Sequence, residues 1–120
     1  MKDLTIVLGA SENPQRYSNM AVRRLVALGL PVLAIGKRAG FIASTPIRTD
    51  IPPGTWAHTV TIYLAPANQA DWRARVLALK PSRVIFNPGA EHAAFATELR
   101  EAGIEVVEAC TLVMLATGGY

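Results

Sequence analysis

Short runs of consecutive apolar residues, many of them β-branched, recur along the chain, and stretches with apolar residues every three or four positions separate them. Runs this short indicate strands buried on both faces, whereas the wider spacing indicates helices with one buried side. The pattern predicts strands over residues 4–8, 31–35, 58–64, 83–86 and 104–107. It predicts helices over residues 18–28, 91–102 and 109–116, and one more that begins after Asn68 and ends at Lys80.

Residue types at the ends of these segments support the boundaries. Gly29 suits the position after the first helix, and Pro31 prevents that helix from continuing. Asn68 has a side chain suited to capping the N-terminus of the next helix. Residues 41–57 are rich in Pro and Thr and are predicted to be irregular, with a short edge strand around residues 42–48.

Helical spacing also predicts which side chains face the core. In the first helix these are Tyr17, Met20, Ala21, Leu25 and Leu28. In the next two helices they are Trp72, Val76, Leu79, Phe95 and Leu99. Residues 118–120 are predicted to form a tail.

The alternation of strands and helices implies a parallel sheet with right-handed crossovers. We therefore expect an α/β fold, a three-layer, Rossmann-like, doubly wound domain with a mostly parallel sheet of five to six strands. A length of 120 residues fits a single domain.

In such sheets a ligand binds beyond the carboxyl ends of the strands, at the point where the strand order reverses. The chain segments predicted to reach that edge are scattered in sequence but are expected to lie close together in space. They are Gly9–Ser11, Gly36–Arg38, Leu64–Pro66, Asn87–Gly89 and the neighbourhood of Cys110.

Composition narrows the class of protein. The hydrophobic fraction of 51% fits strands that are covered on both faces. No apolar run reaches the roughly 18–20 residues of a membrane-spanning helix, and the first residues lack the features of a signal peptide. The single cysteine, Cys110, excludes an internal disulfide and a multi-cysteine metal site. We therefore expect a cytoplasmic protein that does not associate with membranes.

The net charge of +3 is unevenly distributed, with +4 on residues 1–50 and −1 on residues 51–120. The positive half contains the first predicted βα turn, which favours an anionic ligand there. The sequence has no run of basic residues and no aromatic residues interleaved with basic ones. Nucleic acid is therefore a less favoured partner than a small anion.

The turn after the first predicted strand has the character of a phosphate site. Gly9, Ala10 and Ser11 form a small-residue turn between a strand and a helix N-terminus, where backbone N–H groups point outward. Arg16 and Ser18 add donors of a suitable type. The turn is not the G-x-G-x-x-G dinucleotide motif, because Ser and Pro replace its second and third glycines. An ordinary βα turn is the alternative interpretation.

The end of the second predicted strand also discriminates between ligands. Nicotinamide-binding folds place an acidic residue there, which accepts hydrogen bonds from a ribose diol. This chain has Gly36 followed by Lys37 and Arg38. Two cations favour a ribose that carries a phosphate, and the alternative is a solvated basic loop.

Several of these segments together resemble the small stand-alone CoA-binding proteins, relatives of the CoA-binding domain of succinyl-CoA synthetase. The resemblance is carried by Gly9-Ala-Ser11 with the extension Asn13-Pro-x-Arg16-Tyr-Ser18, by Asn87-Pro-Gly-Ala-Glu91, and by the stretch from Gly103 to Cys110. It covers essentially the whole chain. It implies one CoA-binding, Rossmann-like domain over residues 1–120, with coenzyme A or an acyl-CoA as the ligand.

The resemblance also implies a role for each segment. The glycine turn and its Arg/Ser extension hold the pyrophosphate, the loop after the second strand meets the ribose phosphate, and the turns after the later strands flank the adenine. The binding residues implied in this way are Gly9, Ala10, Ser11, Arg16, Tyr17, Ser18, Gly36, Lys37, Arg38, Leu64, Pro66, Asn87, Pro88 and Gly89.

The chain departs from the family pattern at two of these places. Many members carry Val-Asn-Pro at the end of the second strand, whereas this chain has Ala34-Ile-Gly-Lys-Arg38. The residue before Pro88 is often Gln in the family, and here it is Asn87, which is one methylene shorter. The first departure leaves the positive charge of the ribose site in place but alters its geometry. The second shortens the reach of a hydrogen bond from that position.

The sequence shows no catalytic set. His58 and His92 have no third group at the spacing of a triad or a metal site, so we interpret both as structural or surface residues. Cys110 is the one candidate for chemistry, because a thiol at a helix start could exchange with the thiol of CoA. A small buried apolar side chain is the alternative for Cys110.

Three functions follow as hypotheses. The first is a binding module for CoA or an acyl-CoA without catalytic activity of its own. The second is an oxidoreductase or redox sensor that uses NADP. The third is a CoA-thiol exchange protein that acts through Cys110. The apolar C-terminal helix is in addition a candidate surface for a homodimer.

Overall fold

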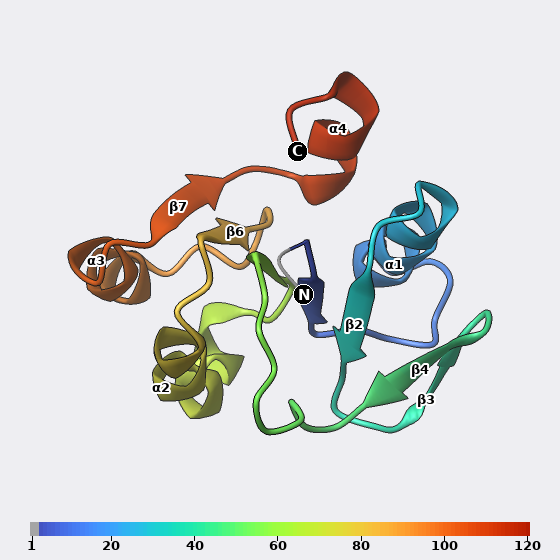
Figure 1. Cartoon of the computed structure of the whole chain (residues 1–120), viewed down its shortest axis with the longest axis horizontal. Helices are drawn as coiled ribbons and strands as arrows, with labels where there is room; N and C mark the ends of the chain where they lie inside the picture. The colour runs from blue at the N-terminus through green and yellow to red at the C-terminus, as the bar shows by residue number, and fades with distance from the viewer. Residues whose placement is uncertain (1–2) are drawn as a thin grey trace.

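The computed structural model describes residues 3–120, in which short strands and helices alternate (Figure 1). The strands are β1 (Thr5–Leu8), β2 (Val32–Ile35), β3 (Gly40–Ile42), β4 (Thr45–Arg48), β5 (Thr59–Ile62), β6 (Arg83–Phe86) and β7 (Glu105–Glu108). The helices are α1 (Tyr17–Ala27), α2 (Ala70–Leu79), α3 (Ala93–Glu101) and α4 (Thr111–Thr117), and the short 3₁₀ helix η1 covers Pro66–Asn68.

The strands form one sheet with the order β3-β4-β2-β1-β5-β6-β7. All neighbouring strands are parallel except β3 and β4, which form an antiparallel hairpin. From β1 the chain proceeds first to β2 on one side and later to β5 on the other, so the strand order reverses at β1. The carboxyl end of β1 is therefore the place where a doubly wound sheet offers a crevice.

The fold is the predicted three-layer α/β arrangement, consistent with a Rossmann-like fold. Figure 1 shows α2 and α3 on one side of the sheet and α1 and α4 on the other. Successive residues of a strand point to opposite faces, so Ile6 and Leu8 pack with α2 and α3 whereas Val7 packs with α1. Both faces of β1 are consequently buried, as its continuous apolar run predicted.

The strand count differs from the prediction, with seven strands in place of five to six. The difference lies in residues 40–48, where the single predicted edge strand is a hairpin of two. Each strand of this hairpin is short and half-exposed, and only Ile42 and Ile47 are buried in it. A pattern with one buried residue in each strand gives too weak a periodic signal to separate the two.

The inward face of α1 was predicted incorrectly in part. Ala21 and Leu25 are buried as expected, but Tyr17 is 67% exposed, Met20 37% and Leu28 48%. The helix instead buries Ser18, Asn19 and Val22 alongside Ala21 and Leu25. Polar residues can occupy the buried side when hydrogen bonds satisfy them, and apolar periodicity alone does not detect them.

The start of α2 also differs from the prediction. Gln69, rather than Asn68, precedes the helix, and its side chain makes no capping hydrogen bond. The reason is the 3₁₀ turn η1, which uses Asn68 as its last residue. Of the predicted inward residues, Val76 is fully buried, and Trp72 and Leu79 pack against the core while remaining partly exposed.

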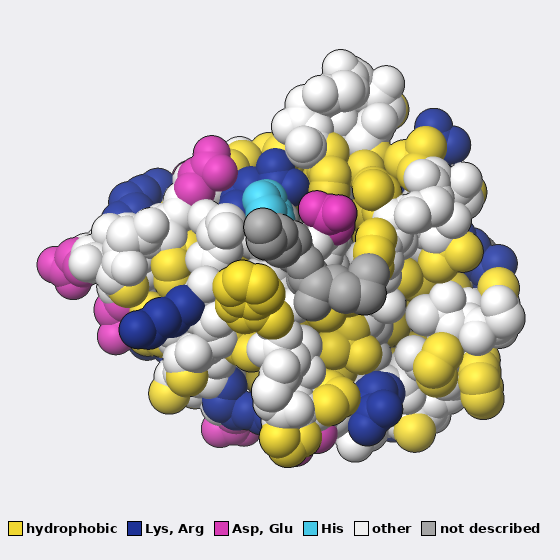
Figure 2. All heavy atoms as spheres, in the orientation of Figure 1, with side chains coloured by type: hydrophobic (Ala, Val, Ile, Leu, Met, Phe, Trp, Pro, Cys, Tyr) yellow, Lys and Arg dark blue, Asp and Glu magenta, His cyan; other side chains and the backbone are white. Residues whose placement is uncertain are grey.

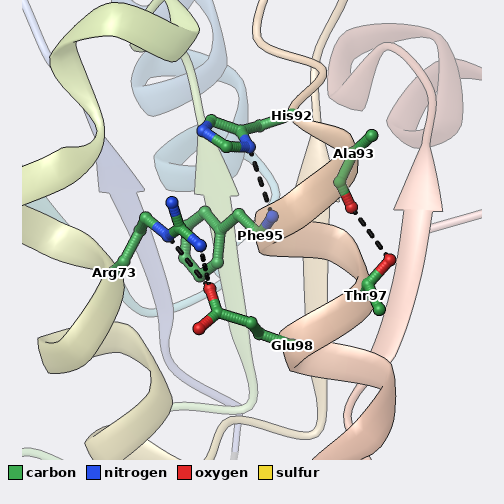
Figure 3. Close-up of polar contacts among 6 residues, drawn as sticks. All are labelled: Arg73, His92, Ala93, Phe95, Thr97 and Glu98. Atoms are coloured by element: carbon green, nitrogen blue, oxygen red, sulfur yellow. Dashed lines mark hydrogen bonds and ion pairs between the residues drawn. The ribbon is translucent and has the colours of Figure 1, made fainter.

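Residues of α3 behave as the sequence predicted. Phe95 and Leu99 are fully buried, and the Phe95 ring meets Phe86 edge to face at a centroid distance of 5.6 Å. His92 is the N-cap of this helix, and its Nδ1 accepts the Phe95 N–H at 3.2 Å (Figure 3). This hydrogen bond gives His92 a structural role at the start of α3.

An ion pair joins the two helices on this face of the sheet. Arg73 of α2 donates to Glu98 of α3, and the Arg73 guanidinium also lies 5.7 Å from the centre of the Phe95 ring (Figure 3). At the first residues of β1 and β6, Tyr120 hydrogen-bonds Thr5, and the Arg83 guanidinium stacks on the Tyr120 ring at 4.4 Å. The end of the chain is therefore packed against the sheet, in contrast to the tail that was predicted.

The carboxyl ends of β1 and β2 approach each other unusually closely at Gly36. A Cβ atom added to Gly36 would lie 2.4 Å from the carbonyl oxygen of Ala10 and 2.8 Å from Cγ2 of Ile47. The Gly36 N–H donates to the Arg48 carbonyl at 2.9 Å, which holds the strand end in place. The absence of a side chain at Gly36 thus permits the turn after β1 to rest on the end of β2.

We expect Gly36→Ala to lower the free energy of unfolding by roughly 1–3 kcal/mol, the usual cost of overpacking. The new methyl group would collide with backbone, which cannot move aside as a flexible side chain can. Urea denaturation measures the change. Gly119→Ala is the matched control, since the atoms nearest to its new methyl group would be 3.8 and 4.0 Å away. Equal stability of Gly36→Ala and the wild type would contradict the close approach.

Candidate functional site

The turn after β1 is hydrogen-bonded to the end of β2 and packs against the residues that follow β5. The N–H groups of Gly9 and Ala10 both donate to the Ile35 carbonyl at 2.8 Å. Gly9 has a φ of +101°, a conformation that other residues rarely adopt, and a Cβ there would lie 3.2 Å from the Leu64 side chain. The chain therefore turns sharply at the reversal point of the sheet, as the glycine predicted.

The loop between β1 and α1 is held by its own hydrogen bonds. Ser11 Oγ accepts the Asn13 N–H at 3.1 Å, and Asn13 Oδ1 accepts the Gln15 N–H at 3.0 Å. Buried Asn19 donates from Nδ2 to the Ser11 carbonyl at 2.8 Å, and its Oδ1 accepts from Arg23. These contacts fix the loop without any ligand. Sequence reasoning missed Asn19, although an Asn beside the apolar stripe of a helix is the available signal.

The N-terminus of α1 opens beside this loop. The helix follows Arg16, no side chain caps its first turn, and that turn contains no acidic residue. The N–H groups of a first helical turn have no acceptor within the helix, and the helix dipole adds partial positive charge there. The structure thus places uncapped donors next to the Gly9 turn.

Most of the predicted binding residues line one cavity of about 600 Å³, which we call the basic cavity. From the predicted set it brings together Gly9, Ala10, Ser11, Arg16, Tyr17, Ser18, Lys37, Arg38 and Pro88. The remaining lining residues are Glu12, Asn13, Ile47 and Tyr63. The volume is typical of a site for a small organic ligand.

A second cavity of about 410 Å³, which we call the side cavity, adjoins the basic cavity. The two share Gly9 and Lys37 as lining residues. The side cavity lies between the strand ends and the start of α2, and it includes the predicted residues Gly36 and Leu64. Trp72 and Asp71 of α2 also line it, and the sequence pattern did not single out Asp71.

Three predicted residues lie outside the linings of these two cavities: Pro66, Asn87 and Gly89. Asn87 is buried, donates from Nδ2 to Thr61 Oγ1 at 2.7 Å, and accepts the Thr111 N–H at 2.9 Å. Its amide therefore joins β5 to the start of α4 and is occupied by protein partners. Gly89 donates its N–H to Glu91, and Pro66 begins η1.

A further buried amide holds the loops that border the cavities. Gln69 donates from Nε2 to the Leu64 carbonyl at 2.8 Å and to the Ala90 carbonyl at 2.6 Å. It thus ties the loop after β5 to the loop after β6. Sequence reasoning missed this residue because its two partners are distant in the chain.

The charges at the basic cavity are free of ion pairs with protein carboxylates. Within residues 3–120 the ion pairs are Arg73 with Glu98 and Arg75 with Asp50, so Arg16, Lys37 and Arg38 take part in none. All three side chains are exposed. Figure 2 shows Lys and Arg side chains spread around one face of the molecule rather than gathered in a single patch. The three cations that line the basic cavity are available to an anion because no described carboxylate forms an ion pair with them, and not because they belong to a larger basic patch.

Tyr63 lines the basic cavity and reaches Cys110 and Thr111 at the start of α4. Its hydroxyl is buried and has no hydrogen-bond partner, and burial raises its pKa to about 12. The Thr61 and Thr111 hydroxyls beside it are bonded to each other at 2.7 Å. Tyr63 therefore remains protonated over the physiological pH range.

The remaining candidates for chemistry lie apart from the two cavities. Cys110 is the half-buried N-cap of α4, near Tyr63, and lines neither cavity. His58 precedes β5 and contacts Thr59 through Nδ1 at 2.8 Å. Over residues 3–120, no three His, Cys, Asp or Glu side chains cluster as a metal site requires. Over the same residues, no helix has the length and apolar character to cross a membrane.

Comparison with known proteins places this architecture in a family. A family model described as a CoA binding domain matches residues 4–116. The crystal structure of an uncharacterized protein is 38% identical, with a TM-score of 0.94, and the match covers 100% of this chain and 99% of that one. No protein among the curated sequences matches the chain.

Two further solved structures share the fold. The cell-free ID.343 protein from Thermus thermophilus is 26% identical, with a TM-score of 0.83 and coverage of 99% of this chain and 91% of that one. A hypothetical protein from Pyrococcus horikoshii is 17% identical, with a TM-score of 0.84 and coverage of 97% and 82%. At the last level of identity the likeness shows the fold alone.

The unpartnered Tyr63 hydroxyl leads to a pH-dependent prediction. Between the ordinary pKa of 10.0 and the folded value of about 12, only the unfolded chain loses this proton, so the Tyr63 contribution destabilises the fold as pH rises. Tyr63→Phe removes that contribution. The stability of this variant relative to the wild type should be unchanged or higher at neutral pH and should increase above about pH 10.

Urea denaturation at neutral pH and at about pH 11 tests this prediction. Tyr17→Phe, which alters an exposed tyrosine, is the matched control. A difference between Tyr63→Phe and the wild type that stays constant over this pH range would contradict the prediction.

Proposed function

The chain belongs to the family of CoA binding domains, and from this premise we propose that residues 1–120 form one domain that binds coenzyme A or an acyl-CoA. The observation that carries the proposal is the basic cavity. Three cations without ion pairs and an uncapped helix N-terminus line the same space. This combination suits a ligand with several phosphate groups.

We propose that the pyrophosphate binds at the Gly9 turn and the start of α1. Gly9, Ala10 and Ser11 present backbone there, Arg16 contributes charge, and the first turn of α1 contributes N–H donors. Ser18 and Tyr17, at the beginning of α1, line the same cavity.

Lys37 and Arg38 are proposed to bind the phosphate on the ribose. Both follow the end of β2, at the position where nicotinamide-binding folds use a carboxylate for the ribose diol. Both line the basic cavity together with the Gly9 turn. A phosphorylated ribose gains charge-assisted hydrogen bonds from these side chains, and a plain diol does not.

The side cavity is proposed to receive the adenine. Leu64 and Trp72 offer apolar surface for a flat ring, and Asp71 offers an acceptor for its amino group. Pro88 lines the basic cavity directly. Pro66, Asn87 and Gly89 are proposed to act on the site by shaping the loops, since Asn87 is occupied by Thr61 and Thr111.

The proposed role is binding, without catalysis by this chain. NADP is the second candidate ligand, because Lys37 and Arg38 suit a phosphate on either ribose position. The ligand titrations below distinguish the two.

Isothermal titration calorimetry with CoA, dephospho-CoA, NADP and NAD tests the proposal. CoA should bind at least roughly tenfold more tightly than dephospho-CoA, since hydrogen bonds to charged groups contribute on the order of 1.5–3 kcal/mol. Tighter binding of NADP than of CoA would favour the second candidate. Equal affinities for CoA and dephospho-CoA would contradict the role given to Lys37 and Arg38.

Variants separate the two phosphate sites. Replacing both Lys37 and Arg38 with Gln should remove the preference for CoA over dephospho-CoA. Arg16→Gln should weaken both ligands by a similar factor, because the pyrophosphate is common to them. Arg24→Gln and Lys80→Gln are the matched controls, since both side chains are exposed and line neither cavity.

A further inference from the structure

Glu12 is the one acidic side chain among the described residues that line the basic cavity. It leaves the loop between β1 and α1 and reaches the β3–β4 hairpin, where Oε2 accepts the Phe41 N–H at 3.0 Å. A Cβ atom at Gly40 would lie 2.4–2.7 Å from the three atoms of the Glu12 carboxyl group. The carboxylate therefore rests directly on the bare backbone of Gly40.

This contact is one of two hydrogen bonds that hold the ends of the segment with Lys37 and Arg38. Lys37 and Arg38 lie in the short turn between β2 and β3. At one end of that turn, the Gly36 N–H donates to the Arg48 carbonyl at 2.9 Å. At the other end, the Phe41 N–H donates to Glu12. The hairpin itself pairs with the sheet over only Ala34–Ile47 and Ile35–Arg48, so a side chain from outside adds substantially to its attachment.

We propose that Glu12 acts as a strap, that is, a side chain that fastens the turn with Lys37 and Arg38 to the Gly9 loop and thereby determines ligand specificity. This proposal rests on the function proposed above. The reach of Glu12 holds the turn with Lys37 and Arg38 in place against the Gly9 loop, so the site is formed before the ligand arrives. Its charge opposes the same ligand, because it adds a carboxylate to a cavity that takes phosphates. The two effects have opposite sign, and the balance sets how tightly the ligand is held.

Two substitutions separate the effect of the length of the Glu12 side chain from the effect of its negative charge. Glu12→Gln keeps an oxygen acceptor at the same distance and removes the charge. Glu12→Asp keeps the charge and is one methylene too short to reach the Phe41 N–H. Gly40→Ala approaches the contact from the other side, since its methyl group displaces the end of a flexible side chain and leaves the backbone intact.

The expected results follow from this separation. Glu12→Gln should bind CoA more tightly, by roughly two- to fivefold at low salt, and the gain should shrink as salt screens the charge. The gain should be smaller for dephospho-CoA, which has fewer negative charges. Glu12→Asp and Gly40→Ala should bind CoA more weakly by roughly threefold or more, because the turn is no longer held.

Hydrogen exchange of the Phe41 amide gives a readout that does not depend on the ligand. Exchange should be faster by roughly fivefold in Glu12→Asp and Gly40→Ala, which lose one hydrogen bond, and close to the wild-type rate in Glu12→Gln. Glu101→Gln, which removes an exposed carboxylate on α3, controls for net charge and should change neither measurement.

Calorimetry of CoA and dephospho-CoA with all variants, together with Phe41 exchange, decides the matter. The proposal is overturned if Glu12→Gln binds CoA no better than Glu101→Gln, or if Glu12→Asp leaves both Phe41 exchange and CoA affinity at wild-type values. Absence of CoA binding by every protein, the wild type included, would instead refute the proposed function. In that case hydrogen exchange of the Phe41 amide alone tests whether Glu12 holds the turn. Unchanged exchange in Glu12→Asp and Gly40→Ala would overturn that role of Glu12.

Discussion

The close contact between the turn after β1 and the end of β2 is the constraint on which the site depends. Gly9 and Ala10 both donate to the Ile35 carbonyl, and Gly36 allows the Ala10 carbonyl to lie against it. The contact places the start of α1 beside the loop that carries Lys37 and Arg38. Two segments that are separate in sequence thereby form one basic cavity.

Buried polar side chains then hold the rim of the sheet in a single arrangement. Asn19 supports the loop before α1, Gln69 connects the loops after β5 and β6, and Asn87 joins β5 to α4. Because these side-chain amides are buried, leaving any of these hydrogen bonds unmade would cost free energy. These three residues therefore position the site while leaving its surface to glycines, small residues and cations.

In this structure, different residues stabilise the fold and line the cavities. The apolar strands and the inward faces of α1, α2 and α3 supply the stability of the fold. The turns at the carboxyl ends of the strands supply the groups that face the cavities. Since neither face of the sheet is free, the strand ends near β1 are where this fold offers room for a ligand.

By itself, the sequence determined the order of strands and helices, the parallel sheet and the Gly9 turn, because apolar runs and glycines act locally. Only the tertiary structure decided that residues 40–48 form a hairpin, that Asn19 rather than Met20 is buried, and that Asn87 bonds Thr61 and Thr111. These outcomes depend on partners far away along the chain. Spacing within one element carries no information about such partners, so their side chains were placed by packing and hydrogen bonding.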